Sequence, residues 1–362
     1  MSGDHNGSEF DRIFSDGGAV STQAPDAEPP TRPRRKKRRG WLWLLLALVL
    51  VVVLLVVAVL AYAAHLGRQW DKGTDRVDAS EVFGPDATAA PEPTGTGTNV
   101  LLLGSDSRSE DVDYSSSTGV RSDTILVAHI PDDGSGIQIM SIPRDMWVEV
   151  EGHGEAKINA AMSYGGLPLT TQTVGDFIGA DIHHVAIIDF EGFKDLTDAL
   201  GGVTVDSEQA FESGGYSFSE GSNTLDGEAA LAFVRARKNF ADGDFQRARN
   251  QQAFLKGVID KVMSPETLSN PQKVSETVGK FSPYITVDDG LDSGTIAGLA
   301  VSLRDYRTDG IDFFTAPVAG TGRSDDGQSI VLADEDALEE MRTAFAEDTV
   351  ADYAENAEEA HL

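Results

Sequence analysis

The uncharged segment WLWLLLALVLVVVLLVVAVLAYAA, Trp41–Ala64, divides the chain into two unequal parts. At ~1.5 Å of rise per residue, a helix of this length crosses a ~30 Å hydrocarbon core with some tilt. The basic cluster RPRRKKRR, residues 32–39, directly precedes it, and segments rich in Lys and Arg stay on the cytoplasmic side of a membrane. The sequence therefore predicts one N-terminal transmembrane helix, residues 41–64, in the cell membrane, with a cytoplasmic N-terminus and an extracellular C-terminal part.

A cleaved signal peptide is the competing interpretation, because AYA at residues 61–63 resembles a cleavage site. The apolar core of a signal peptide is only ~7–15 residues long, whereas this run is much longer and follows a long polar arm. A retained single-pass anchor is therefore favoured. The basic cluster lies against the predicted membrane, so it is interpreted as a topology signal, and no nucleic-acid partner is expected.

Charge and composition define the remaining boundaries. The chain has 29 Lys and Arg against 59 Asp and Glu, a net charge of −30, yet residues 1–40 carry more basic than acidic side chains. Those residues have too little apolar content for a core and are predicted to be a disordered cytoplasmic arm. Residues 65–98 are predicted to be an extracellular linker and residues 348–362 a disordered acidic tail. Residues 99–347 are long enough for one large domain, and without Cys its core must be adequate without disulfides.

Within this domain, apolar runs alternate with helical patterns. The expected strands are Asn99–Gly104, Thr124–Ile130, Gly136–Ile142, His184–Phe190, Gly202–Val205 and Ile311–Pro317. The expected helices are Lys157–Ser163, Leu169–Ile178, Glu191–Leu200, Asp226–Val234, Asp244–Met263, Ser293–Tyr306 and Glu335–Ala346. Continuous apolar strands between helices predict an α/β fold, an α/β/α sandwich with a central mixed sheet covered on both faces. The strand order is left open.

Four arginines stand close together in LAFVRARKNFADGDFQRARNQQ, residues 231–252. Asp226 is expected to cap a short helix that ends near Val234, so Arg235 and Arg237 should lie in an extended segment and project from one face. The next helix, capped by Asp244, has the apolar stripe Leu255, Val258 and Val262. Four-residue steps backwards along that stripe reach Gln251 and Arg247, which should face inward, while Arg249 should point elsewhere.

An inward-facing arginine needs a partner. An internal carboxylate would suffice, and the chain has many. The alternative is an anion cavity reached by Arg235, Arg237 and Arg247, because the planar guanidinium binds phosphate oxygens bidentately and stays charged. Asp106, after the strand in LLLGSDSR, and Asp123, before the strand in RSDTILV, favour the second interpretation. Two carboxylates at strand ends suit a Mg²⁺–pyrophosphate site, although an isolated Asp there is more often a turn or cap residue.

Seven consecutive motifs carry a family resemblance. They are NVLLLGSDSR, RSDTILVAHI, MSIPRDMWVEV, KINAAMSYGG, DFEGFKDLTDALGGVTV, LDGEAALAFVRAR and GDFQRARNQQAFL. In this order they resemble the LytR-CpsA-Psr family of cell-wall glycopolymer ligases, over roughly residues 99–262. The basic arm and single apolar helix also fit the layout of that family.

The resemblance implies roles for particular residues. The metal-binding aspartates of the family fall on Asp106 and Asp123, with Mg²⁺ as the expected ion and Mn²⁺ as the alternative. Its pyrophosphate-binding and catalytic positions fall on Arg144, Arg235, Arg237 and Arg247, with Gln251 as a further polar contact, and Arg108 matches the Arg of its first motif. Leu255, Val258 and Val262 would line a tunnel for the lipid tail, or serve as plain core packing.

The implied activity is a phosphotransferase. Such an enzyme takes a glycan from a polyprenyl-pyrophosphate carrier, joins it through a phosphodiester to a peptidoglycan hydroxyl, and releases polyprenyl phosphate. Two alternatives stay open: a pyrophosphatase or phosphatase acting on the same lipid, and a non-catalytic envelope sensor of lipid or polymer. The general base is open, with Asp106 and Asp145 suitable by type, and so is the glycopolymer, whether teichoic acid, capsule or arabinogalactan. The histidines His153, His183 and His184 are interpreted as structural.

Overall fold

The computed structural model describes residues 39–93, 96–105, 122–237, 240, 243–302 and 311–360. The chain divides into two units, Met1–Val57 and Ala58–Leu362, and the fold below belongs to the second. The helix α1 (Arg39–Gly73) covers the whole apolar run and continues beyond it. Among the residues that the structure describes, no helix meets the length and apolarity needed to cross a membrane.

A seven-stranded mixed sheet forms the centre of the second unit, in the order β1-β12-β7-β2-β3-β4-β13. β2 pairs in parallel with β7 and antiparallel with β3, and β13 pairs in parallel with β4. The sheet strands are β1 (Asp75–Val77), β2 (Thr98–Ser105), β3 (Ser122–Ile130), β4 (Ile137–Ile142), β7 (His184–Asp189), β12 (Ile285–Asp288) and β13 (Ile311–Thr315). The predicted central mixed sheet is confirmed.

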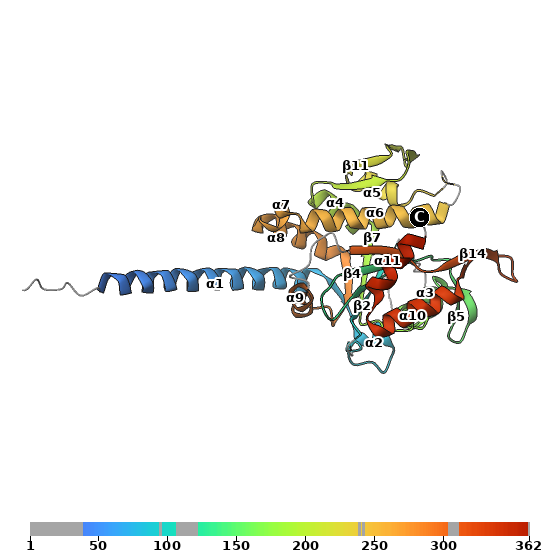
Figure 1. Cartoon of the computed structure of the whole chain (residues 1–362), viewed down its shortest axis with the longest axis horizontal. Helices are drawn as coiled ribbons and strands as arrows, with labels where there is room; N and C mark the ends of the chain where they lie inside the picture. Colours follow the sequence, from blue (N-terminus) through green and yellow to red (C-terminus); the bar gives the residue numbers. More distant parts are fainter. Residues whose placement is uncertain are drawn as a thin grey trace, which may run out of the picture. The chain divides into compact units, whose positions relative to one another are not determined.

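The two faces of this sheet pack against different helices, because successive side chains of a strand point to opposite sides. Leu101 and Leu103 of β2 join a buried cluster with α3 (Ala160–Ile178) and α10 (Glu335–Glu347). Val100 joins another cluster, which includes side chains of α6 and α9. Figure 1 shows α4, α5 and α6 above the strands β7, β4 and β2, and α3 and α10 to the right of these strands. Burial on both faces explains the continuous apolar runs in the strand sequences.

The remaining elements connect and extend these layers. The hairpin pairs are β5 with β6, β8 with β11, β9 with β10, and β14 with β15. Their bounds, with those of the other helices, are α2 (Ala79–Phe83), β5 (Trp147–Val150), β6 (Gly154–Lys157), α4 (Phe190–Ala199), β8 (Val203–Ser207), β9 (Phe211–Ser213), β10 (Tyr216–Phe218), β11 (Gly221–Leu225), α5 (Gly227–Val234), α6 (Gly243–Met263), α7 (Pro265–Leu268), α8 (Pro271–Phe281), the 3-10 turn Ser282–Tyr284, α9 (Ser293–Ser302), β14 (Val318–Arg323), β15 (Ser329–Ala333) and α11 (Val350–Ala360).

Two helices expected from the sequence form one element in the structure. α3 contains a break at Gly165 and Gly166, where the φ of Gly166 is +65°. It begins at Ala160 because residues 154–157 form β6 instead. A positive φ is accessible to glycine at little steric cost, which explains the glycine at position 166 of this break.

Within the described residues, parts of the expected linker and of the expected tail form regular secondary structure. In the region 65–98, α1 extends to Gly73, β1 pairs with β12, and α2 buries Val82 completely. In the region 348–362, α11 buries Val350 and Ala354 against the core. Composition alone misses such segments, because a few apolar side chains at helical spacing gain their stability from tertiary packing.

Candidate active site

A cavity of about 760 Å³ lies between α6 and the sheet, with α4, α5 and α8 around it. Its lining is mainly apolar, but four arginines from three separate segments of the chain contribute to it: Arg144, Arg235, Arg237 and Arg247. A cavity of this size, apolar with a few convergent polar groups, is typical of a ligand site. The structure thus brings the predicted arginines together, although their role in binding pyrophosphate stays a prediction.

α6 supplies one wall of this cavity through the predicted stripe. Arg247, Gln251, Leu255, Val258 and Val262 all line it. Arg247 is only 9% exposed, which confirms that this stripe faces inward. Since these positions are three or four residues apart, they follow one helical face from a polar end to an apolar end.

Arg249 points away from the cavity, as the helical spacing predicts. Its Nε lies 2.9 Å from Glu208 Oε2, and its NH2 group donates to Gln246 Oε1 at 2.6 Å. The Arg249 side chain is 37% exposed. Arg247 and Arg249 therefore have different environments although only one residue separates them.

Arg235 and Arg237 both line the cavity, but the predicted extended backbone is wrong at the first of them. Arg235 is the C-cap of α5, with φ −95° and ψ −6° in the helical region, and its N–H bonds to Leu231 O. Ala236 is buried between the two arginines. The turn at the end of α5 therefore brings both guanidinium groups to the cavity without a strand.

Asn250 fixes α5 and α6 relative to each other. This residue is buried, and its Nδ2 donates to Phe233 O at 3.2 Å, a carbonyl in the last turn of α5. Helix-terminal carbonyls need such partners because no later N–H of the helix reaches them. The predicted cap of α5 is also present, since Asp226 Oδ1 accepts from Ala229 N at 2.9 Å. Asp244 is no N-cap, because α6 already begins at Gly243.

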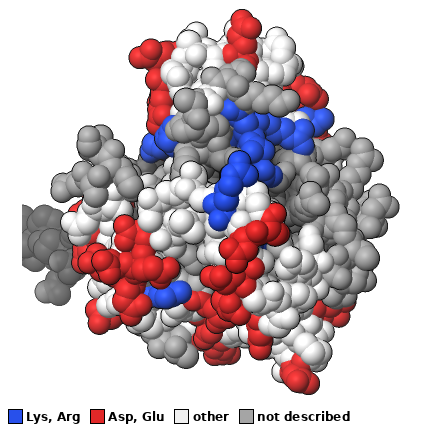
Figure 2. Space-filling view, turned by 90° about the vertical axis from the view of Figure 1, so that its right-hand side faces the viewer, with Lys and Arg blue, Asp and Glu red and all other residues white. Residues whose placement is uncertain are grey.

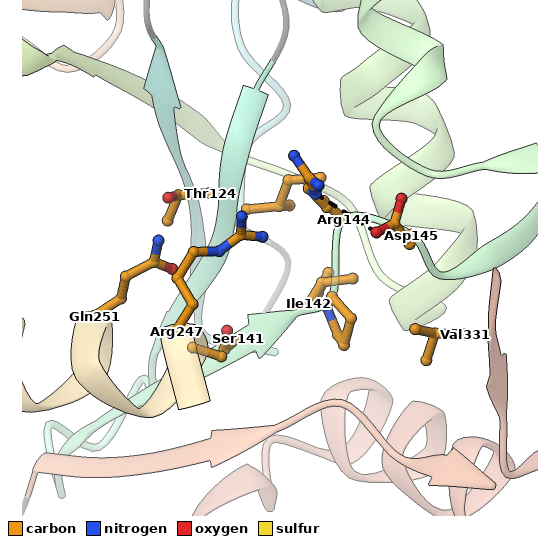
Figure 3. Close-up of a pocket in the computed structure, with 11 residues that line it drawn as sticks. Thr124, Ser141, Ile142, Arg144, Asp145, Arg247, Gln251 and Val331 are labelled. Atoms are coloured by element: carbon orange, nitrogen blue, oxygen red, sulfur yellow. Dashed lines mark ion pairs between the residues drawn. The ribbon is translucent and has the colours of Figure 1, made fainter. Parts of the chain in front are cut away.

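Arg144 approaches the same place from the segment after β4. A small pocket of about 30 Å³ is lined by Arg144, Asp145, Arg247, Gln251 and Thr124, among others. Figure 3 shows Arg247 rising from α6 and Arg144 from the β4 side, with both guanidinium groups on the same side of this pocket. Four of these residues also line the large cavity, so the two spaces share a border.

Asp145 forms ion pairs at this border. Its Oδ1 lies 2.8 Å from Lys157 Nζ, and its Oδ2 lies 3.5 Å from Arg144 Nε. Each carboxylate oxygen therefore has a cationic neighbour. Asp145 therefore links Lys157 of the β5–β6 hairpin to Arg144, which is one of the four arginines of the cavity.

The predicted metal ligands are only partly described. Asp106 and Arg108 lie outside the described residues, and for Asp123 the structure describes the backbone alone. That backbone is informative, because β2 and β3 pair Gly104 with Thr124 but Ser105 with Ser122. Asp123 is therefore the extra residue of a β-bulge, and Asp106 follows the paired Ser105 directly. Among the described side chains, no group of three His, Asp or Glu could hold a metal ion.

The surface charge agrees with a localised cationic site. Figure 2 shows Lys and Arg side chains gathered in a band on one face, with groups of Asp and Glu nearby. The chain as a whole has a net charge of −30. An anion would therefore find its attraction concentrated at this band rather than spread over the surface.

The histidines predicted to be structural do not line the cavity. His183 is 3% exposed, and its Nδ1 accepts from Asn99 N at 2.9 Å. Burial lowers the pKa of the His183 imidazole, which favours the neutral form that this hydrogen bond requires. His184 Nδ1 lies 3.1 Å from Asp288 Oδ1, and His153 stacks on Tyr164 with ring centroids 4.5 Å apart.

Several cavity residues had no signal strong enough to be predicted. Trp70 comes from α1, Thr124 from β3, and Thr277, Val278 and Phe281 from α8. Helical spacing in PQKVSETVGKF would have indicated an amphipathic α8, but not which surface it covers.

Comparison with known proteins agrees with this architecture. The model of the LytR_cpsA_psr family matches residues 65–347. A Bacillus anthracis protein named polyisoprenyl-teichoic acid–peptidoglycan teichoic acid transferase TagU is 37% identical over 183 residues, which cover 50% of this chain and 58% of that protein. The probable cell wall biosynthesis protein LcpB of Corynebacterium glutamicum is 37% identical over 271 residues, 71% of this chain and 63% of LcpB.

Among solved structures, that of Bacillus subtilis TagV is similar with a TM-score of 0.59 and 27% identity, covering 71% of this chain and 98% of TagV. Because the family model matches well over half of its residues, the chain belongs to the LytR_cpsA_psr family. The chain spans somewhat less than two thirds of the length of the curated relatives it matches.

Proposed function

We propose that this protein is a phosphotransferase that joins a glycopolymer, carried on a polyprenyl-pyrophosphate lipid, to a hydroxyl of peptidoglycan. The observation that carries this proposal is the single cavity with Arg144, Arg235, Arg237 and Arg247 on one part of its lining and apolar side chains on the rest. A polyprenyl pyrophosphate has the matching division, a dianionic head and a long apolar tail. The name of the related TagU protein supports the same reaction class, and the name of LcpB supports a role in cell-wall biosynthesis.

The reaction requires charge stabilisation more than covalent chemistry by the protein. The acceptor hydroxyl oxygen attacks the phosphorus nearer the glycan, a new P–O bond forms, and the bond from that phosphorus to the bridging oxygen breaks. Polyprenyl phosphate leaves, and the hydroxyl proton passes to a base. Guanidinium groups donate to the non-bridging and leaving oxygens as negative charge develops there, and they keep their charge at any working pH.

Arg247 is suited to this role because its environment is pre-arranged. It is 9% exposed, and the buried Asn250 one turn further on ties α6 to the end of α5. Donors held in place in a region of restricted solvent cost little reorganisation during the reaction. Arg235, which is exposed, would meet the substrate at the rim.

We propose Asp106 and Asp123 as ligands of Mg²⁺, with Mn²⁺ as the alternative. Carboxylate oxygens are the donors that a hard divalent cation prefers. In the sequence, Asp106 directly follows Ser105, which pairs with Ser122 next to Asp123. When bound, the ion would neutralise phosphate charge next to the arginines. Arg108 is proposed as an additional contact to the lipid phosphate.

We also propose that Trp41–Ala64 anchors the protein in the cell membrane, with the N-terminus cytoplasmic and the family domain outside. The basic cluster before it and the length of the apolar run support this. Several large apolar side chains of α1, among them Leu50, Val59 and Leu60, are more than half exposed. The chain contains no Cys, so Ser8→Cys and Ser329→Cys can each be labelled selectively. In intact cells, a membrane-impermeant maleimide should label the protein only at position 329. Labelling only at position 8 would show that the topology is opposite to the one proposed.

The activity is tested by incubating the purified full chain with a synthetic polyprenyl-pyrophosphate glycan, peptidoglycan and Mg²⁺. We expect polyprenyl phosphate to be released in step with covalent attachment of sugar to peptidoglycan. Release without attachment would indicate a lipid pyrophosphatase instead. No release at all would indicate a non-catalytic envelope sensor.

A further inference from the structure

The cavity continues well beyond the arginines. On α6 its lining runs from Arg247 to Val262, which at ~1.5 Å per residue is a path of about 22 Å. Three other elements also line it, through Thr277, Val278 and Phe281 of α8, Ile285 of β12 and Trp70 of α1. Val262 and Phe281 pack against one buried cluster, and Phe281, Ile285 and Trp70 share a second one, which places them near the Val262 end. The same helix that contains the apolar run Trp41–Ala64 therefore contributes a side chain to this cavity.

Trp70 is held in one orientation. Its Nε1–H donates to Leu291 O at 3.1 Å, and its ring packs against a buried cluster that contains Ile285, Val287 and Leu291. A tryptophan with its single donor satisfied keeps a large apolar ring available for other contacts. Trp70 is partly buried and lines the cavity, and its shared cluster with Phe281, which also packs in the cluster of Val262, places it toward the apolar end of the α6 stripe.

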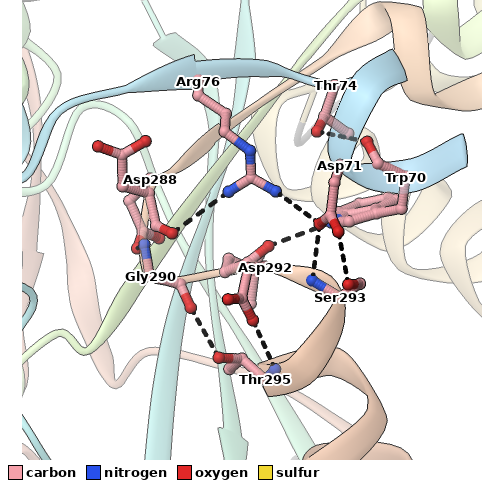
Figure 4. Close-up of polar contacts among 11 residues, drawn as sticks. Trp70, Asp71, Thr74, Arg76, Asp288, Gly290, Asp292, Ser293 and Thr295 are labelled. Atoms are coloured by element: carbon pink, nitrogen blue, oxygen red, sulfur yellow. Dashed lines mark hydrogen bonds and ion pairs between the residues drawn. The ribbon is translucent and has the colours of Figure 1, made fainter. Parts of the chain in front are cut away.

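A polar network holds the end of α1 next to α9. Asp71 accepts from both Ser293 N, at 2.9 Å, and Ser293 Oγ, at 2.6 Å. Arg76 NH2 lies 3.2 Å from Asp71 Oδ1, and Arg76 NH1 donates to Asp289 O at 3.3 Å. Figure 4 shows Arg76 between the Asp71 carboxylate and the segment after β12, with Trp70 beside Asp71. Rotation of this last turn would break several hydrogen bonds at once.

Contacts with α8 hold the C-terminal part of α1 on the side away from α9. Ser275 Oγ donates to Gln69 Oε1 at 2.9 Å, and Tyr62 OH donates to Pro271 O at 2.7 Å. A Cβ on Gly73 would lie 2.1 Å from Ser282 Oγ, so only glycine permits the close approach at this point. The end of α1 and α8 therefore form one wall of the cavity.

We propose that Trp70 is a specificity-determining residue that contacts isoprenoid units of the lipid carrier beyond those of a farnesyl chain and makes binding depend on tail length. This inference rests on the proposed function, because it takes the anionic head of the lipid to lie at the arginines. If the phosphate head of the lipid binds at the arginines, the apolar part of the cavity between Leu255 and Trp70 is left for the isoprenoid tail. Only a long tail reaches the indole ring, so the ring adds apolar contact for long carriers and none for short ones.

The test compares two probes, undecaprenyl monophosphate and farnesyl monophosphate, binding to the full chain in phospholipid vesicles. Trp70→Ala should weaken binding of undecaprenyl monophosphate about fivefold and leave binding of farnesyl monophosphate unchanged. Trp70→Phe, which keeps an aromatic ring, should retain most of the selectivity. Gln69→Ala is the matched control, because it removes a contact between α1 and α8 at a residue that does not line the cavity.

Equal weakening for both probes, no change for either, or the same selectivity loss in Gln69→Ala would each overturn the assignment of Trp70. A second measurement needs no variant. Undecaprenyl monophosphate with a diazirine on an isoprenoid unit in the middle of its tail should cross-link to peptides containing Trp70 or Phe281, and cross-links confined to peptides containing Leu102 or Leu126 would contradict the proposal. If the unaltered protein binds neither probe, the proposed function itself fails, and the role of Trp70 fails with it.

Discussion

The two ends of the cavity are built differently. At one end, arginines from three separate segments converge, and Asp145 lies beside one of them, Arg144. At the other end, α6, α8 and α1 contribute apolar side chains with no directional contacts to a ligand. Binding by charge depends on a few exact positions, whereas binding by apolar contact is spread over many groups of small individual effect. Substitutions at the two ends should therefore differ in the size of their effect on activity and in the kinetic constant that they change.

The largest loss is expected from the proposed metal ligands. Asp106→Ala or Asp123→Ala should reduce turnover by ~100-fold or more, because the charge on the transferred phosphoryl group would lose its metal partner. Removal of Mg²⁺ with EDTA should have the same effect on the unaltered protein. Glycan transfer to peptidoglycan is the measurement, and Asp133→Ala, an exposed aspartate in the turn before β4, is the control. Retained activity in both variants would favour the non-catalytic sensor.

The second-largest loss of activity is expected from substitution of the arginines at the charged end of the cavity. Arg235→Ala and Arg247→Ala should each reduce turnover by at least about tenfold, equal to ~1.4 kcal/mol of transition-state stabilisation, without unfolding the domain. Arg247→Lys should recover only part of the activity, because an ammonium group lacks the planar fork of a guanidinium. Full recovery with lysine would mean that charge alone matters at this position.

At the apolar end the effect should be smaller and should fall on KM. Leu255→Ala removes contact with the tail in the ground state and the transition state alike, so KM for the lipid donor should rise roughly three- to fivefold with little change in kcat. Ile259→Ala is the matched control, since both residues pack against the same buried cluster but Ile259 does not line the cavity. A similar KM change in both variants would show that the effect is due to altered packing of α6.

The smallest effect is expected at Arg249. Its partners are Glu208 and Gln246, away from the cavity, and exposed ion pairs contribute little to stability. Arg249→Ala should therefore change turnover by less than about twofold in the same transfer assay. A loss equal to that of Arg247→Ala would contradict the different orientations assigned to these two arginines.

The charged end could be predicted from the sequence to a useful extent. Helical spacing placed Arg247 and Gln251 on the face of Leu255 and excluded Arg249, because the periodicity of a helix fixes relative directions along it. The backbone of Arg235 was predicted incorrectly, since its helical φ and ψ result from the C-cap of α5 rather than from any preference visible in VRAR. The roles of Asp106, Arg108 and Asp123 remain predictions.

The apolar end could not be predicted in the same way. Trp70 and Phe281 pack against the same buried cluster because α1 docks on α8, a segment about two hundred residues further along the chain. Nothing local distinguishes an apolar residue that lines a cavity from one that fills a core. The order in residues 65–83 and 350–360 was missed for the same reason, because it depends on partners such as β12 and the core under α10.

The bulge at Asp123 has a consequence for protein engineering. The pairing of Thr98–Gly104 with Thr124–Ile130 keeps Ser105 opposite Ser122 whatever the number of residues between them. The length of the sequence that joins the two strands therefore does not set their register. Deletion of Asp123 would instead leave Ser105 opposite Ser122 in a regular ladder, and the extra twist that a bulge gives its strand would be lost. An engineered change of the joining sequence thus keeps the pairing of the two strands, whereas a change at Asp123 alters the twist of β3 where β2 ends.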